Sequence, residues 1–254
     1  MRRISILNFK GGTGKSSLTE NLGHAVARLG HKVLLVDGDR QSNTTITLLG
    51  KRLTPSLRDV MTEEATIQDA IKEARPNLFI IPSDTDLDRV ATWIKDNHFG
   101  YDVIREAVEG LDDFYLVLID HAGAFTPVME ALLLASSEIL IPCELEPYSV
   151  NGIFDMQAKL EKQLRKHKLK NAGIIPYNVD LRYSMARQYL KELRSAFGDL
   201  VTAPVRTDSV VSKAQSVGMT VFEYQETYDV KSRAAEDFKA LAEDLIEEAQ
   251  EVTP

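Results

Sequence analysis

The chain has 254 residues, of which 44% are hydrophobic and 27% are charged, an ordinary composition for a globular protein. Its single cysteine, Cys143, excludes an internal disulfide and a zinc site built from two cysteine pairs. No apolar run approaches the roughly 18 residues of a membrane-spanning helix, and polar residues interrupt the N-terminus by Lys10. We therefore expect no signal peptide and a cytoplasmic protein.

Charge is distributed unevenly along the chain. There are 30 basic and 38 acidic residues, and the net charge of −8 argues against a protein that is basic throughout. Residues 159–194 nevertheless hold ten basic and three acidic residues, a local surplus of seven positive charges, whereas the last predicted helix is acidic. Such segregation indicates a surface for an anionic partner, although a solvated helix face explains the 159–170 stretch equally well.

The N-terminus has the pattern of a strand, a glycine-rich loop and a helix. Residues 3–9 form a short apolar run, and residues 16–29 carry apolar side chains at helical spacing before Gly30. Between them, residues 10–17 read Lys-Gly-Gly-Thr-Gly-Lys-Ser-Ser. A phosphate-binding loop requires this order of elements, and the Lys-Ser pair that follows the glycines argues against an incidental turn.

Each residue type in this loop has a physical reason to bind a nucleoside triphosphate. Glycines let backbone N–H groups turn toward phosphate oxygens, Lys15 can reach the β- and γ-phosphates, and the Ser16 hydroxyl can ligate Mg²⁺. The N-terminus of the following helix adds positive potential at the same anion. The predicted phosphate-binding residues are Gly11, Gly12, Thr13, Gly14, Lys15, Ser16 and Ser17. Lys10 lies too early to be the usual loop lysine and needs another role.

Apolar runs of strand type alternate with helical patterns along the rest of the chain. Further strands are predicted at residues 32–36, 78–81, 115–119, 139–141, 172–176 and 200–204. Helices are predicted at residues 44–50, 65–74, 86–110, 126–135, 149–168, 183–197 and 235–250. The alternation predicts an α/β fold with a doubly wound, mostly parallel sheet and helices on both faces, and the phosphate-binding loop places this fold in the P-loop NTPase class. We expect one domain over residues 1–254, with no N-terminal helix-turn-helix domain.

Carboxylates follow two of the predicted strands, at the end where ligands of such sheets bind. Asp120 ends the run 115–119 and can hold the Mg²⁺ shell through water, although a strand-end aspartate can instead cap the next helix. Asp37 and Asp39 directly follow the strand at 32–36, and one of them could orient or deprotonate an attacking water, with a plain polar turn as the alternative. The predicted metal-site residues are Ser16, Asp37, Asp39 and Asp120.

Four blocks of sequence resemble the ParA/Soj branch of the deviant Walker A ATPases, a superfamily that also includes MinD. They are the loop at 10–17, the segment 37–45, the strand ending at Asp120, and a C-terminal stretch that begins Ala-Pro-Val-Arg at residue 203. Together they span nearly the whole chain. The resemblance implies a Mg²⁺-dependent ATPase that converts ATP to ADP and phosphate, and a homodimer that encloses two ATP molecules between its subunits.

The resemblance also implies roles for individual residues. Lys10 would be the signature lysine, which crosses the dimer interface to the partner subunit's nucleotide. Asp39 would be the hydrolytic carboxylate, so that Lys10, Lys15 and Asp39 form the catalytic set, and Asp37 would support the metal shell or the switch. The base would pack against Asn178, Pro204 and Arg206, for which ordinary loop structure is the alternative.

Two positions depart from the family pattern. After Asp120 the family most often has Thr-Pro-Pro, whereas this chain has His121, Ala122 and Gly123. Arg40 stands where many members have proline. We assign no catalytic role to His121, because a lone histidine beside an aspartate is more often a hydrogen-bonded bystander.

The resemblance extends to a function. ParA-type dimers bind DNA without sequence preference, through phosphate contacts that weaken with salt. We therefore predict an ATP-dependent switch that associates with the nucleoid and segregates plasmid or chromosome DNA with a ParB-like adaptor. The candidate DNA contacts, each with a solvated surface charge as its alternative, are Arg182, Arg187, Lys191, Lys213, Lys231 and Arg233.

Three other functions stay open from the sequence. A ParA-like ATPase that positions a protein assembly would use the same site, and a scaffold that does not hydrolyse ATP would use it only to associate. A MinD-like membrane switch would need a basic amphipathic C-terminal helix. Residues 243–254 are acidic instead and would be repelled by anionic lipid, so we expect no membrane binding.

Overall fold

The structure is a computed structural model that describes residues 1–97, 100–167 and 169–251, without the side chains at 162–167 and 249–251. Within these ranges, no helix combines the length and the apolar character that crossing a membrane requires. Part of the predicted basic surplus lies outside the described side chains, namely Lys162, Arg165, Lys166 and Lys168.

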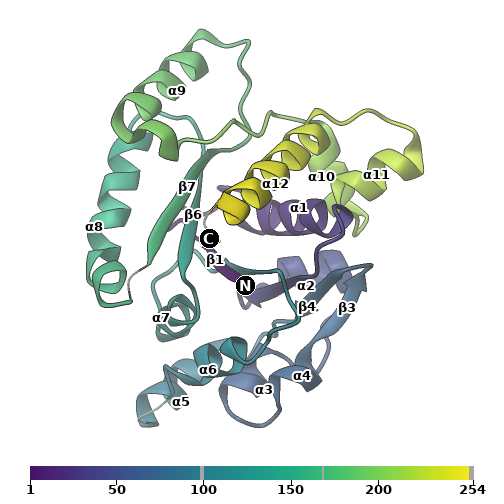
Figure 1. Ribbon diagram of the computed structural model, residues 1–254, viewed down its shortest axis with the longest axis vertical. Coiled ribbons are helices and arrows are strands. Elements are labelled where there is room, and N and C mark those ends of the chain that lie inside the picture. The colour runs from purple at the N-terminus through teal and green to yellow at the C-terminus, as the bar shows by residue number, and fades with distance from the viewer. Residues whose placement is uncertain (98–99, 168, 252–254) are drawn as a thin grey trace.

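A sheet of seven strands forms the centre of the fold (Figure 1). The strands are β1 (Arg2–Ile6), β2 (Val33–Gly38), β3 (Lys72–Arg75), β4 (Leu78–Ile81), β5 (Leu116–His121), β6 (Glu138–Cys143) and β7 (Lys170–Pro176). Their order is β3-β4-β2-β5-β1-β6-β7, and every pairing is parallel except that of β3 with β4. This order confirms the predicted α/β fold with a doubly wound, mostly parallel sheet.

Helices cover both faces of the sheet (Figure 1). They are α1 (Lys15–Arg28), α2 (Asn43–Leu49), α3 (Leu57–Met61), α4 (Ile67–Ala70), α5 (Val90–Asp96), α6 (Val103–Glu109), α7 (Pro127–Leu134), α8 (Ser149–His167), α9 (Ser184–Phe197), α10 (Ser209–Ser216), α11 (Val221–Tyr228) and α12 (Arg233–Glu251). One core contains side chains of α1, α10, α11 and α12, and a second contains those of α3 to α7. A third core joins α7, α8 and α9 to β6 and β7.

Strand β2 shows why both faces need a helical layer. Val33 and Leu35 belong to the first core, whereas Leu34 and Val36 belong to the second, and all four side chains are fully buried. Because successive side chains of a strand point to opposite faces, a strand that is apolar throughout must be covered on both. The apolar part of β2 is thus covered on both faces. The polar residues Asp37 and Asp120 follow the apolar parts of β2 and β5 and lie at the carboxyl edge of the sheet, where ligands bind.

Two predicted helices differ from the structure. The prediction at 65–74 is wrong in its second half, because α4 is followed by β3, which folds back on β4 through a turn with Asn77 in the left-handed region (φ 62°). The prediction at 86–110 divides into a 3₁₀ turn, η1 (Leu87–Arg89), and the helices α5 and α6. Gly100 lies between these helices, where a Cβ would come 2.8 Å from the backbone of Ile94.

The strand predicted at 200–204 is also wrong. Val201 forms only an isolated bridge with Ile174, and Pro204 has no N–H to extend the pairing. The short helices α3, α10 and α11 are not predicted from the sequence, since five to eight residues carry little periodic signal. The predicted helices that correspond to α1, α2, α7, α8, α9 and α12 are confirmed to within two residues at each end.

Candidate nucleotide-binding site

The loop between β1 and α1 has the backbone of a phosphate cradle. Gly12 and Gly14 have φ angles of 76° and 82°, which glycine adopts without steric cost. A Cβ at Gly14 would also overlap the ring of Tyr177. The loop therefore needs glycine at position 14 for two reasons, and the chain enters α1 directly behind it with its N–H groups at the helix start.

Lys15 places a buried ammonium group at this loop. Its side chain is buried at the first residue of α1, and Nζ donates a hydrogen bond to the carbonyl of Lys10 at 3.2 Å. Burial lowers the pKa of Lys15, an effect that the charges of Asp120 and Asp39 oppose. A bound phosphate would supply the countercharge that a buried ammonium lacks.

Asp37 and Asp120 form a buried pair of carboxylates at the ends of β2 and β5. The two residues are directly paired in the sheet register, and both are fully buried. Burial, together with the charge of Asp120, raises the pKa of Asp37 to about 7, and burial raises the pKa of Asp120 to about 6. Two buried like charges repel each other, so this pair favours a nearby cation or a bound proton.

Threonines of α2 hold both carboxylates. The N–H and the hydroxyl of Thr45 donate to Oδ2 of Asp37 at 2.9 and 2.6 Å, and the hydroxyl of Thr44 donates to Oδ2 of Asp120 at 2.8 Å. Oδ1 of Asp120 is buried without a hydrogen-bond partner among the described residues. A free, fixed carboxylate oxygen fits a role in the shell of Mg²⁺, which usually keeps several waters and binds few protein groups.

The described side chains form no metal cage by themselves. No group of three His, Cys, Asp or Glu residues is arranged to hold a metal ion in the ranges that the structure covers. Ser16, in the first turn of α1, lies near this edge, because its side chain is among the causes that lower the pKa of the Asp120 carboxyl. Ser16 and Asp120 would therefore hold Mg²⁺ together with phosphate oxygens and water.

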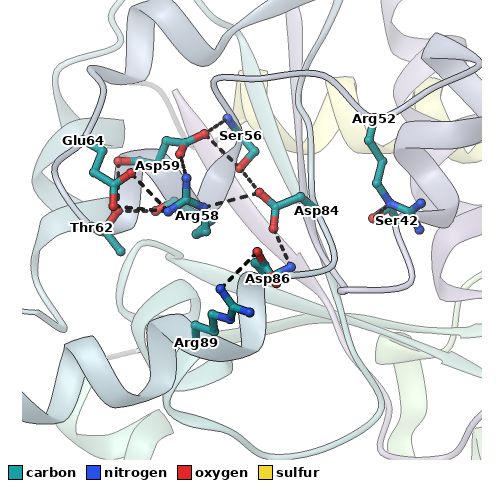
Figure 2. Close-up of polar contacts among 10 residues, drawn as sticks. All are labelled: Ser42, Arg52, Ser56, Arg58, Asp59, Thr62, Glu64, Asp84, Asp86 and Arg89. Atoms are coloured by element: carbon teal, nitrogen blue, oxygen red, sulfur yellow. Dashed lines mark hydrogen bonds and ion pairs between the residues drawn. The ribbon is translucent and has the colours of Figure 1, made fainter.

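The loop after β2 presents Asp39 at the surface of the same site. Asp39 is half-buried, and its Oδ1 accepts a hydrogen bond from the N–H of Gln41 at 2.9 Å. Ser42 adopts the left-handed conformation (φ 57°), and its hydroxyl accepts a hydrogen bond from Nε of Arg52 at 3.1 Å (Figure 2). These contacts hold the loop and engage Oδ1 of Asp39, so Oδ2 can bind a ligand or a water.

A second polar network joins segments that follow α2 and β4, and Figure 2 shows its contacts around Asp84. The N–H of Ser83, just after β4, donates to the Thr45 hydroxyl at 2.9 Å. Next in the chain, Asp84 accepts hydrogen bonds from the Ser56 hydroxyl and the Asp86 N–H, and it lies 3.6 Å from Nε of Arg58. The sequence contains no motif for this network, because its members come from three separate segments.

Lys10 differs from Lys15 in exposure and in partners. Its Nζ lies 2.6 Å from Glu146 and 3.4 Å from Glu144, both beyond β6, and the hydrogen bond to Glu146 is the main cause that raises its pKa. The side chain of Lys10 is 51% exposed. A lysine held by exposed carboxylates can exchange them for another anion at little cost.

A hollow of about 360 Å³ lies beside the phosphate loop. Asn178 and Arg206 line it together with Gly12, Gly14 and Ser17, as do residues of α10, so the structure brings two of the three predicted base contacts to the loop. Pro204 is not part of this lining. The guanidinium of Arg206 is fixed by Asp237 at 2.7 Å.

Two further residues of this hollow are missing from the sequence-based prediction. The hydroxyl of Tyr177, at the end of β7, donates to Oγ of Ser17 at 2.8 Å and so joins the far edge of the sheet to the loop. Gln215 of α10 donates to Oε2 of Glu20 at 3.4 Å. Glu20 is fully buried, its Oε1 has no hydrogen-bond partner among the described residues, and burial is the main cause that raises its pKa to about 8.

Comparison with known proteins identifies the family. A family model described as an AAA domain matches residues 1–174. The chromosome partitioning protein ParA of Caulobacter vibrioides is 30% identical over 97% of this chain and 94% of its own length. The chromosome-partitioning ATPase Soj of Thermus thermophilus is 30% identical over 99% and 98%. The chain belongs to the ParA/MinD family of P-loop ATPases.

A solved structure supports the same assignment. The septum site-determining protein MinD of Pyrococcus horikoshii, complexed with Mg-ADP, superposes with a TM-score of 0.78 at 26% identity and covers 96% of this chain and 95% of its own. The predicted resemblance to ParA and MinD is therefore confirmed. The roles of individual residues in this family member remain predictions that rest on the geometry of the site.

The two departures from the family pattern have structural explanations. Nε2 of His121 lies 2.7 Å from the Ser5 hydroxyl, which lies 2.6 Å from that of Ser136. Burial lowers the pKa of His121 to about 3, so the imidazole is a neutral part of the core. Arg40 is exposed and pairs with Asp88 at 3.4 Å on the outer side of the loop. Neither residue needs a catalytic role.

The candidate DNA contacts are all exposed, but they differ in their partners. Arg182 forms an ion pair with Asp180, while Arg187 and Arg233 donate hydrogen bonds to backbone carbonyls. The ammonium groups of the three lysines, Lys191, Lys213 and Lys231, have no hydrogen bond or ion pair among the described residues, although the backbone carbonyls of Lys191 and Lys213 accept hydrogen bonds from serines. The lysines are therefore free to contact phosphates, and the arginines also organise their own loops.

Substitution of Lys15 tests the phosphate site. We expect Lys15→Ala to weaken ATP binding about 100-fold, because removal of a charge-assisted hydrogen bond to phosphate costs about 2–3 kcal/mol. Fluorescent-nucleotide titration measures the affinity, and Lys95→Ala, at an exposed position of α5, is the matched control. An unchanged affinity for Lys15→Ala would contradict the assignment of this loop.

Glu20 predicts a pH-dependent stability. Its folded-state pKa of about 8 lies above its usual value of 4.5, so between these pH values the folded chain keeps a proton that the unfolded chain releases. The free energy of unfolding should therefore fall as pH rises through this range. Glu20→Gln removes this contribution, so its stability relative to wild type should improve from pH 5 to pH 8 by at least about 1 kcal/mol.

Urea unfolding at the two pH values measures this difference. Glu247→Gln, at an exposed position of α12, should track the wild type at both. If Glu20→Gln and the wild type lose stability in parallel, Glu20 is not the buried acid described above.

Proposed function

We propose that the protein is a Mg²⁺-dependent ATPase whose ATP-bound homodimer binds DNA without sequence preference and segregates plasmid or chromosome DNA. A ParB-like adaptor would stimulate hydrolysis and carry the cargo. The observation that carries this proposal is the difference in burial between the two loop lysines. Lys15 is buried at its own phosphate loop, whereas Lys10 is exposed at the rim of that loop, where a second chain can approach.

The chain's own residues supply most of the hydrolytic chemistry in this proposal. Backbone N–H groups of the loop and Lys15 hold the phosphates, and the hollow beside Asn178 takes the base. Ser16 and Asp120 would hold Mg²⁺, which would supply positive charge against the phosphate oxygens. Asp39 orients a water or accepts its proton, and Lys10 of the partner subunit stabilises the negative charge that develops on the phosphate oxygens.

The names of the relatives support DNA as the target. The ParA and Soj relatives are both named for chromosome partitioning, and this chain offers exposed lysines on α9, α10 and the loop before α12. Two subunits would present each lysine twice, which increases the phosphate contacts of the dimer. The exposed carboxylates of α12, among them Glu243 and Glu247, disfavour an anionic membrane as the target.

The likeness to MinD favours one second candidate. A septum site-determining protein shares the fold and 26% of the sequence, so positioning of a protein assembly would use the same ATPase. The two candidates differ in the partner that stimulates ATP turnover. A DNA-bound adaptor would do so for segregation, and a component of the assembly would do so for positioning.

Substitution of Asp39 separates the switch from its hydrolysis. With ATP and Mg²⁺, Asp39→Ala should form the dimer and bind duplex DNA as the wild type does, while its turnover falls about 100-fold, since a general base typically contributes that much or more. Phosphate release and DNA co-sedimentation measure the two properties. DNA binding should require ATP and weaken steeply with salt.

The exposed Asp113→Ala variant should behave as wild type in both assays. Normal turnover by Asp39→Ala would remove Asp39 from the mechanism. DNA binding by the nucleotide-free protein at high salt would count against the switch itself.

A further inference from the structure

The turn before α9 and the first turn of α9 expose three apolar side chains to solvent. Leu181, Tyr183 and Met185 are 37%, 66% and 52% exposed. They alternate with polar residues from Leu181 to the first turn of α9, and we call these three side chains the apolar tip. Three exposed apolar side chains within five residues are a candidate contact with a partner.

Hydrogen bonds fix the turn that carries this tip. The N–H of Arg182 donates to Oδ1 of Asp180 at 3.0 Å, and its guanidinium donates to the same carboxylate at 2.5–3.1 Å. These bonds to Arg182 lower the pKa of Asp180 to about 2. NH1 of Arg187 donates to the carbonyls of Leu181 and Arg182 at 2.6 and 3.0 Å. The apolar tip is thus presented by a preorganised backbone, which reduces the entropic cost of binding a partner.

Positive charge continues from the apolar tip along one side of α9. Arg187, Lys191 and Arg194 follow Tyr183 at intervals of four, four and three residues, so they form one stripe on the helix surface, and all three are exposed. Leu190 and Leu193 face the third core instead. At about 1.5 Å per residue the three cations, from Arg187 to Arg194, extend over about 10 Å, which matches about three phosphates of one DNA strand at about 3.4 Å each.

A second basic segment borders the same turn. The charge of Arg233, the first residue of α12, is among the causes that lower the pKa of Asp180, and the exposed Lys231 lies two residues before it. The charge of Asp180 is offset by its ion pair with Arg182, and the carboxylate of Glu192 accepts a hydrogen bond from Gln188. The turn that precedes α9 lies at the outer edge of the molecule, beyond β7 (Figure 1), and both the cations of α9 and Arg233 of α12 are near it.

We propose that the apolar tip enters the minor groove of duplex DNA while the stripe on α9 follows the phosphates of one strand. This inference rests on the proposed DNA binding and adds a second type of contact to it. Proteins that bind the minor groove combine arginines or lysines with leucine or methionine side chains that wedge between base steps. Phosphate contacts alone would explain the basic residues but not three exposed apolar side chains on a fixed turn beside them.

The test separates apolar from ionic contacts by their salt dependence. With a slowly hydrolysed ATP analogue and Mg²⁺, fluorescence anisotropy would give the affinity for duplex DNA over a series of salt concentrations. The double variant Tyr183→Ser/Met185→Ser should bind at least 10-fold more weakly with an unchanged salt slope, because apolar side chains release no counterions. Lys191→Ala should instead reduce the slope by about one per subunit, because it removes a cation that neutralises a phosphate.

Two measurements complete the test. Energy transfer between dyes at the duplex ends should show bending by the wild type and less bending by the double variant, since wedging kinks DNA. Leu29→Ser, at another exposed apolar position, is the matched control and should leave affinity and bending unchanged. Thermal melting of each variant verifies that the substituted surface residues leave the fold intact.

Each alternative outcome overturns the inference in a recognisable way. If the wild type binds DNA and the double variant binds equally well, the apolar tip is not a DNA contact and the proposed function stands. If the wild type does not bind DNA, both proposals fail. A third outcome is that the wild type binds vesicles that contain phosphatidylserine, whereas the double variant loses this binding and keeps its DNA affinity. The apolar tip would then be a membrane contact instead of a DNA contact.

Discussion

The site is organised around two carboxylates that the sheet forces together. Asp37 and Asp120 are register partners at the ends of β2 and β5, both fully buried, and their nearest fixed partners are threonine hydroxyls rather than cations. Placing two like charges in a buried position is unfavourable unless a cation or a proton joins them. The packing of α2 and the position of Lys15 follow from this constraint, because each supplies hydrogen bonds or positive charge to the pair.

The two loop lysines differ in how firmly one chain holds them. Lys15 is buried at the phosphate loop of its own chain. Residues of the same chain also line the hollow beside Asn178. Lys10 instead faces Glu144 and Glu146 at an exposed rim, where exchange of these partners for an incoming phosphate costs little. A site with one buried lysine and one exposed lysine that can change its partners is suited to a switch in which nucleotide joins two subunits.

Sequence reasoning succeeds where the chemistry is local and stops where distant segments meet. The phosphate loop, Asp37 and Asp120 are predictable because strand, loop and helix signals lie within a few residues of each of them. The hydrogen bond from Tyr177 to Ser17 joins residues 160 positions apart, and the hydrogen bond from Gln215 to Glu20 joins residues 195 positions apart. No local sequence pattern can predict contacts between segments so far apart. The strand β3 is missed for the same reason, since only its pairing with β4 overrides the helical pattern at 65–74.

Sedimentation velocity with and without a slowly hydrolysed ATP analogue and Mg²⁺ tests the central claim, that the complete site belongs to two chains. The wild type should sediment as a monomer without nucleotide and as a dimer with it. Lys10→Ala should still bind the analogue, because Lys15 and the loop remain, but it should stay monomeric or dimerise far more weakly. A wild type that stays monomeric with bound nucleotide, or a Lys10→Ala variant that dimerises as the wild type does, would contradict the account.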